Sequence, residues 1–143
     1  MTQEHIDKLC IALFDRGLES LIELNSKQQT LYLFLDIYYY MQEDGLDIYL
    51  SNNLTPPFDI IPNINAMREL GLSIISDYFE FIKVSFDNNE LHKQGEKWHE
   101  YKSRIGILDK VNYLDPILTK MMTDDFPFNW IEKNYNELNK NLD

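Results

Sequence analysis

The chain has 143 residues, a length typical of one domain, and 44% of them are hydrophobic, which is enough for a core rather than a disordered tail. Its 24 acidic and 13 basic residues give a net charge of −11, which argues against direct binding to nucleic acid or to an anionic membrane surface. The single cysteine, Cys10, excludes an internal disulfide, and the first ten residues lack the pattern of a secretory signal. We therefore expect one domain over residues 1–143, located in the cytoplasm.

The first half of the chain has the apolar spacing of helices. Residues 3–24 predict a helix capped by Thr2, with Gly17 as the point where it is expected to break. Residues 27–43 predict a second helix that is apolar on almost every side between residues 31 and 41, a pattern typical of a helix buried among others. This apolar run is too short to span a bilayer.

The second half predicts shorter helices. A helix over 46–52 follows Gly45, a proline-rich loop follows over 53–62, and Asn63 is expected to cap a helix that ends at Gly71. The remaining predicted helices cover residues 72–86, 90–105 (a polar surface helix), a stretch around 114–122 and the segment 124–138. Only LDIYL at 46–50 competes as a strand. The predicted fold class is an all-α bundle of about six to eight helices around the central helix.

The acidic residues are unevenly distributed. Residues 30–82 carry eight acids and one base, Arg68, so this segment alone has a net charge of −7. Acids without local bases either face water or attract an external cation, and a negative face steers basic protein partners towards it. The candidate partner-binding residues are Glu43, Asp44, Asp47, Asp59, Asp77 and Glu80. A solvated acidic surface without a specific role is the competing interpretation.

Asp36 is a separate case because it lies inside the apolar helix, one turn from Tyr32 and Tyr40. A buried carboxylate has to be hydrogen-bonded or neutralised. We expect a tyrosine hydroxyl, a backbone NH or Arg68 as its partner, and a structural rather than a catalytic role.

Few residues suggest chemistry. His92, Glu96 and His99 share one face of the predicted 90–105 helix, but a di-iron bundle needs this Glu-x-x-His element twice, and it occurs once. Cys10 falls inside an apolar stripe, which favours a core residue over a nucleophile. No phosphate-binding loop, GxSxG turn, HExxH or EF-hand loop is present. We expect no metal and no cofactor.

Part of the sequence resembles a known family. An apolar helix ends in Tyr38–Met41, the turn Glu43-Asp44-Gly45-Leu46 follows, then Tyr49 and Asn52, then the stop AMRELG over 66–71 and another apolar helix. This order is similar to the bacterial domain-of-unknown-function family typified by the neisserial DNA-mimic protein. Leu46 stands where that family has Phe, and one glycine stands where it has two. The resemblance implies an all-α fold and a DNA-mimic role, in which carboxylates imitate the phosphates of a duplex and occupy the basic groove of a DNA-binding protein.

The leading hypothesis is therefore an acidic, non-enzymatic domain that binds a basic protein, with DNA-binding proteins as one such class. An immunity or antitoxin-like protein that binds one partner through a shaped patch is the alternative. A small enzyme using Asp36 or the His92–Glu96–His99 face is the third. The sequence leaves the oligomeric state open, a homodimer included.

Overall fold

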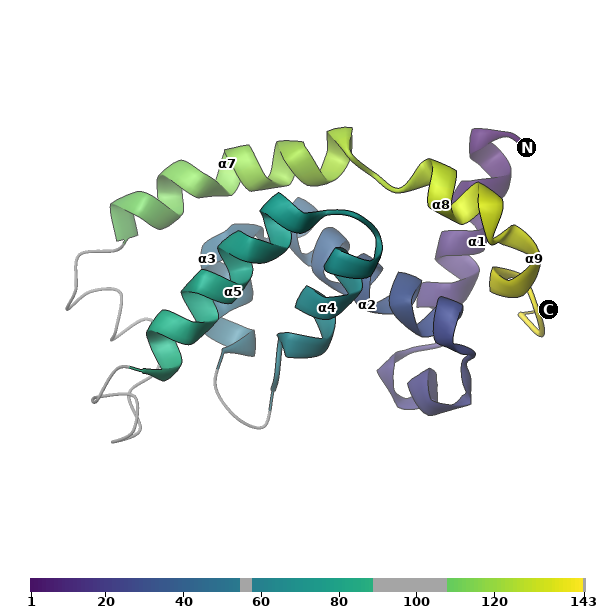
Figure 1. Ribbon diagram of the computed structural model, residues 1–143, viewed down its shortest axis with the longest axis horizontal. Helices are drawn as coiled ribbons and strands as arrows, with labels where there is room; N and C mark the ends of the chain where they lie inside the picture. Colours follow the sequence, from purple (N-terminus) through teal and green to yellow (C-terminus); the bar gives the residue numbers. More distant parts are fainter. Residues whose placement is uncertain (55–57, 89–107, 143) are drawn as a thin grey trace.

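The computed structural model describes residues 1–54, 58–88 and 108–142, and every regular element in these ranges is a helix (Figure 1). The elements are α1 (Gln3–Phe14), the 3-10 helix η1 (Leu18–Glu23), α2 (Ser26–Glu43), α3 (Gly45–Asn53), α4 (Ile61–Glu69), α5 (Ser73–Asp87), α7 (Leu108–Asp124), α8 (Phe128–Lys133) and α9 (Tyr135–Leu138). The all-α fold is confirmed, and the strand candidate LDIYL lies inside α3.

The amino-terminal segment forms two helices where one was expected over 3–24. Thr2 caps α1 as predicted, and its side chain and that of His5 form a reciprocal capping box. The chain leaves the α-helical conformation before Gly17, whose φ of 81° lies in the left-handed region. The expected break at Gly17 is confirmed, and the stretch after it tightens into η1.

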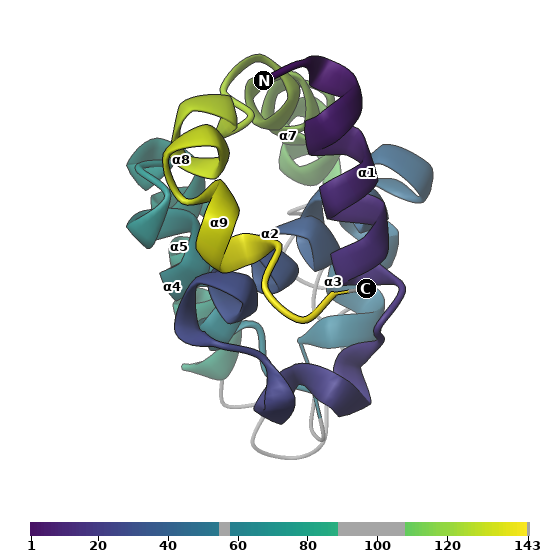
Figure 2. The same cartoon turned by 90° about the vertical axis from the view of Figure 1, so that its right-hand side faces the viewer.

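The central helix is α2, which contacts α1, α3, α4, α7 and α9 (Figure 2). Its side chains Leu31, Phe34, Leu35 and Ile37 are completely buried. Aromatic rings of α2 pack against two other segments. Tyr32 stacks on Phe14 of α1, and the ring of Tyr38 contacts that of Phe126 in the segment between α7 and α8. The aromatic run YLFLDIYYY therefore serves packing.

The start of α2 is joined to the end of the described chain by polar contacts, one of which is buried. Asn25 caps α2, and its side-chain amide donates to the carbonyl of Glu137 at 2.9 Å. The buried Gln28 amide donates to the carbonyls of Leu138 at 3.0 Å and Lys140 at 2.8 Å. These bonds satisfy carbonyls at the end of α9 that have no partner inside their own helix.

The α4–α5 pair follows the predicted pattern with one correction. Gly71, with φ 85°, ends α4, and the Leu72 amide bonds back to the carbonyl of Met67 at 2.9 Å, as in a Schellman motif. Asn63 was expected to cap α4, and this is wrong. The helix begins at Ile61 because Pro62 fits the first turn, and Asn63 instead donates across to the carbonyl of Leu33 at 2.8 Å.

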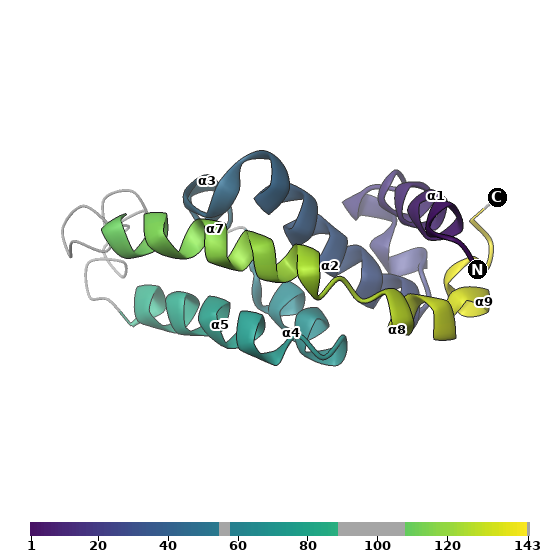
Figure 3. The ribbon, with the colours of Figure 1, turned by 90° about the horizontal axis from the view of Figure 1, so that it is seen from above.

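Helices α5 and α7 run alongside each other in opposite directions (Figures 1 and 3). The predicted inner face of α5 is confirmed, since Leu72, Ile75, Phe79, Ile82 and Phe86 are all buried. Helix α7 is longer than the expected stretch around 114–122 and contains Pro116. The segment predicted over 124–138 divides into α8 and α9 at Asn134.

The polar helix predicted over 90–105 lies outside the described residues. Within the described ranges, no helix has the length and apolar character needed to cross a membrane.

Candidate interaction surfaces

The predicted acidic turn lies at the junction of α2 and α3. Glu43 is the last residue of α2 and Asp44 is the residue between the two helices, and both side chains are exposed. Neither forms an ion pair within the described part of the chain. Gly45 makes the turn with φ 84°, a conformation that favours glycine.

An acid from the distant helix α7 joins this turn. Asp115 packs so closely against Gly45 that a Cβ added there would lie 2.6 Å from its Oδ2. Glu43, Asp44 and Asp115 line one shallow hollow of about 570 Å³, together with Lys120, which is itself bonded to Asp124. The hydroxyl of Thr119 donates to Asp115 Oδ1 at 3.2 Å. We call Glu43, Asp44 and Asp115 the acidic turn.

Sequence analysis missed Asp115, because nothing in the local pattern of α7 connects it with residue 45. The proximity arises from the packing of α3 against α7. Because glycine has no side chain, the α7 carboxylate can approach the backbone of the turn.

Asp47 and Asp59 take part in the local fold. Asp47 is half-buried in the first turn of α3, where a negative charge is favoured by the helix dipole. Asp59 is exposed, and its Oδ1 accepts a hydrogen bond from the amide of Ile61 at 3.0 Å, at the start of α4. This carboxylate therefore satisfies a helix-start donor that has no partner inside its own helix.

Asp77 and Glu80 lie outside the acidic turn, and both have a basic partner. Both are on α5, and both bond to the guanidinium of Arg68 on α4, Asp77 at 3.2 Å. The prediction that these two acids lack a partner is wrong. The turn after α4 reverses the chain, so that Arg68 lies beside the first two turns of α5.

Asp36 is half-buried on α2 and bonds to Asn63 of α4, whose amide lies 3.4 Å from its Oδ2. The expected partners, a tyrosine hydroxyl, a backbone NH or Arg68, were wrong. Burial raises the pKa of Asp36, and the hydrogen bond from Asn63 only partly offsets this. Asp36 lines none of the three hollows described in this section.

The other candidates for chemistry find little support in the described ranges. Cys10 is buried in the core. Burial and, to a smaller extent, the negative charge of Asp7 raise the pKa of its thiol to about 12. The thiol therefore stays protonated and is a poor nucleophile. No group of His, Cys, Asp and Glu side chains in the described residues is arranged to hold a metal ion. His92, Glu96 and His99 lie outside those residues.

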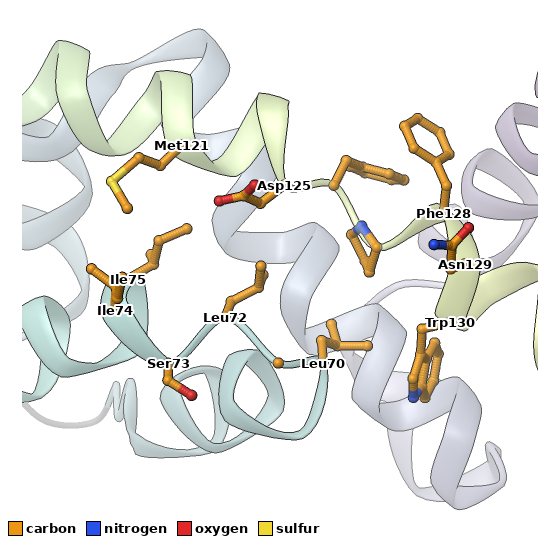
Figure 4. Close-up of a pocket in the computed structure, with 13 residues that line it drawn as sticks. Leu70, Leu72, Ser73, Ile74, Ile75, Met121, Asp125, Phe128, Asn129 and Trp130 are labelled. Carbon is orange, nitrogen blue, oxygen red and sulfur yellow. The ribbon is translucent and has the colours of Figure 1, made fainter.

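A cleft lies between the start of α5 and the segment joining α7 to α8 (Figure 4). It has a volume of about 810 Å³, and Met121 of α7 lies above Ile74 and Ile75 of α5 at one end, while Trp130 lies at the other. A second hollow of about 440 Å³ adjoins it along α5 and is lined by Ile74, Asp77, Tyr78 and Phe81. We call the two together the α5–α7 groove.

This groove was not expected from the sequence. The pattern that indicates it is the outward spacing of Ile74, Tyr78 and Phe81 on α5. A helix that is apolar on two sides has a second surface to cover.

Comparisons of this chain with protein-family models, with curated proteins and with solved structures found no match. The resemblance to the DNA-mimic family therefore stays a prediction.

Proposed function

We propose that this chain is an acidic, non-enzymatic protein-binding domain that docks on a basic protein through the acidic turn. The observation that carries the proposal is the meeting of Glu43, Asp44 and Asp115 in one hollow, from two elements far apart in the sequence. Two of these carboxylates are exposed and without a basic partner in the described part of the chain. Their charge is therefore available to an external cation.

The net charge of −11 supports the same proposal. A protein with such a charge attracts basic surfaces over a distance set by salt, about 10 Å at 0.1 M, so the association rate falls as salt increases. DNA-binding proteins are the partner class that the sequence resemblance predicts, and their basic grooves suit an acidic surface.

The test is affinity capture from cells with wild-type protein and with the double variant Glu43→Gln, Asp44→Asn. The wild type is expected to retain a basic protein at about 50 mM salt and to release it at about 500 mM, where charges are screened within a few ångströms. The double variant is expected to retain much less. If the captured protein binds DNA, a DNA fragment should compete with this chain for it.

The matched control is Glu19→Gln, Glu23→Gln on η1, which removes the same charge from exposed side chains at the opposite end of α2. Since α2 has 18 residues, the two sites lie roughly 27 Å apart along its axis. Equal loss of capture in both variants would mean that net charge alone matters, and equal retention would place the contact elsewhere.

A second candidate function, an immunity or antitoxin-like protein that binds one partner through a shaped patch, is favoured by a different observation. The α5–α7 groove is apolar and concave, unlike the acidic turn. Capture that survives about 500 mM salt would favour this alternative, because apolar contacts are not screened.

A further inference from the structure

Helix α5 carries two apolar faces. One is its buried face against the core, and the other consists of Ile74, Tyr78 and Phe81, at spacings of four and three, with exposed fractions of 64%, 40% and 68%. Surface helices normally place polar residues on the face that turns away from the core. Contiguous exposed apolar side chains of this size are typical of an interaction site.

The exposed stripe continues across a trough onto α7. Ile74 lines both hollows of the α5–α7 groove, and Met121 of α7 lies opposite it (Figure 4). One turn before Met121, Ile117 is partly exposed, and one further turn back Tyr113 is 71% exposed. Helices α5 and α7 run antiparallel (Figure 3), and Met121 is the apolar residue of α7 that lines the larger hollow. A trough between two helices with apolar walls suits the apolar face of a third helix.

Two acids line the groove: Asp125, which has no ion pair among the described residues, and Asp77, which is bonded to Arg68 of α4. Asp77 lines the smaller hollow and Asp125 the larger, and both side chains are exposed. Neither hollow has a lysine or an arginine among the described residues that line it. A helix lying in the groove would meet the exposed carboxylate of Asp125 on a chain with a net charge of −11, so lysine or arginine beside its apolar face would be favoured.

A second copy of this chain is a poorer occupant. Two copies would bring the acidic edges of both grooves together, with a charge of −11 on each molecule. Charge complementarity therefore favours a partner of opposite sign over self-association.

We infer that the α5–α7 groove binds an amphipathic helix of a partner protein, with an apolar face inserted between Ile74, Phe81 and Met121 and basic residues at its edges. This inference rests on the protein-binding role proposed above and adds a second, apolar contact to it. The acidic turn sets the rate of encounter, and the groove sets the lifetime of the complex.

The test uses the whole chain and a defined probe, a labelled peptide of about 18 residues, or five helical turns. Its apolar residues follow the i, i+3, i+4, i+7 pattern and lysines flank them. Two control peptides have the same composition with the apolar residues scattered around the helix, or the same apolar face with glutamate replacing lysine. Fluorescence anisotropy is expected to show at least about tenfold tighter binding of the first peptide than of either control, the value of one buried apolar side chain.

The variants Ile74→Ser and Phe81→Ser should each weaken binding of the basic amphipathic peptide about tenfold. Both side chains are exposed, so circular dichroism should show an unchanged fold. The matched control is Ile22→Ser on η1, where the side chain is 89% exposed and remote from the groove, and its affinity should equal that of the wild type.

Three results would overturn the inference. The scattered peptide binds as tightly as the amphipathic one, the groove variants bind like the wild type, or light scattering shows a dimer that Phe81→Ser dissociates. The first two leave the proposed function standing if Glu43→Gln, Asp44→Asn still loses the captured basic protein. The opposite pattern, with a working groove and an inert acidic turn, contradicts the proposed function alone.

Discussion

Asp36 shows how a single residue can conflict with its surroundings. Its carboxylate lies in a helix whose neighbouring positions are apolar, and its hydrogen-bond partner is the neutral amide of Asn63. The sequence indicated that Asp36 needs a hydrogen-bond partner, and Asn63 is one. It did not indicate the partner, because Asn63 reads as a helix cap when only its neighbours Pro62 and Ile64 are considered.

The raised pKa of Asp36 predicts a pH dependence of stability. The folded chain holds the proton more tightly than the unfolded chain, where the pKa is about 4. The free energy of unfolding therefore falls as pH rises from about 4 through the raised value, and stays lower above it. The variant Asp36→Asn keeps an acceptor for the Asn63 amide and cannot ionise. Its free energy of unfolding should therefore fall less with rising pH than that of the wild type.

Urea denaturation of wild type and Asp36→Asn between about pH 4 and pH 7 measures this difference. Asp44→Asn controls for the loss of one negative charge, since its side chain is exposed. A decline with pH that is as steep in Asp36→Asn as in the wild type would mean that another group causes it.

At the scale of elements, the sequence predicted helices well where the helical spacing of apolar residues continued over many residues. The bounds of α2 and α5 differ from the expected ones by one residue, because both have continuous inner stripes. The start of α7 was missed, since Pro116 lies within it and prolines usually mark helix starts or ends. The contact of Asp115 with Gly45 was beyond prediction, because it depends on how two helices pack.

Gly45 and Gly71 form a matched pair for testing that contact. Both have φ near 85°, so alanine at either position carries backbone strain of about 1–2 kcal/mol. Nothing lies within 4 Å of a Cβ at Gly71, whereas at Gly45 the Asp115 carboxylate would have to move and lose its bond from Thr119. Gly45→Ala should therefore reduce the free energy of unfolding by about 1 kcal/mol more than Gly71→Ala.

Chemical denaturation of both glycine variants, in the wild-type and Asp115→Ala backgrounds, separates the cost of backbone strain from the cost of displacing the Asp115 carboxylate. In the Asp115→Ala background the two glycine substitutions should cost the same. A difference that persists without the carboxylate would contradict the role of the Asp115 contact.

For the whole molecule, the sum of the charges can be read from the sequence, but their arrangement cannot. Arg68 neutralises two acids on the neighbouring helix, while Asp115 adds a negative charge to the turn. Both effects come from tertiary packing. The acids therefore divide into those engaged in the fold and those of the acidic turn that remain open to a partner.

The excess negative charge predicts that salt stabilises the folded chain. Self-repulsion at −11 destabilises the compact state, and salt screens it over about 10 Å at 0.1 M. The melting temperature should rise between about 10 and 200 mM sodium chloride. Glu43→Gln, Asp44→Asn should raise it at low salt only, and Arg68→Gln, which leaves Asp77 and Glu80 unneutralised, should lower it at low salt. A melting temperature that falls with salt would mean that ion pairs outweigh repulsion.

The bonds from Gln28 have a consequence for the synthesis of the chain. The carbonyls that its amide meets lie 110 and 112 residues later in the sequence. At about 5–20 residues per second, a ribosome takes about 5–20 s to reach them. During that interval α2 has been made but α7 and α9, which cover it, have not. Its apolar surface is then accessible to chaperones on every newly made chain.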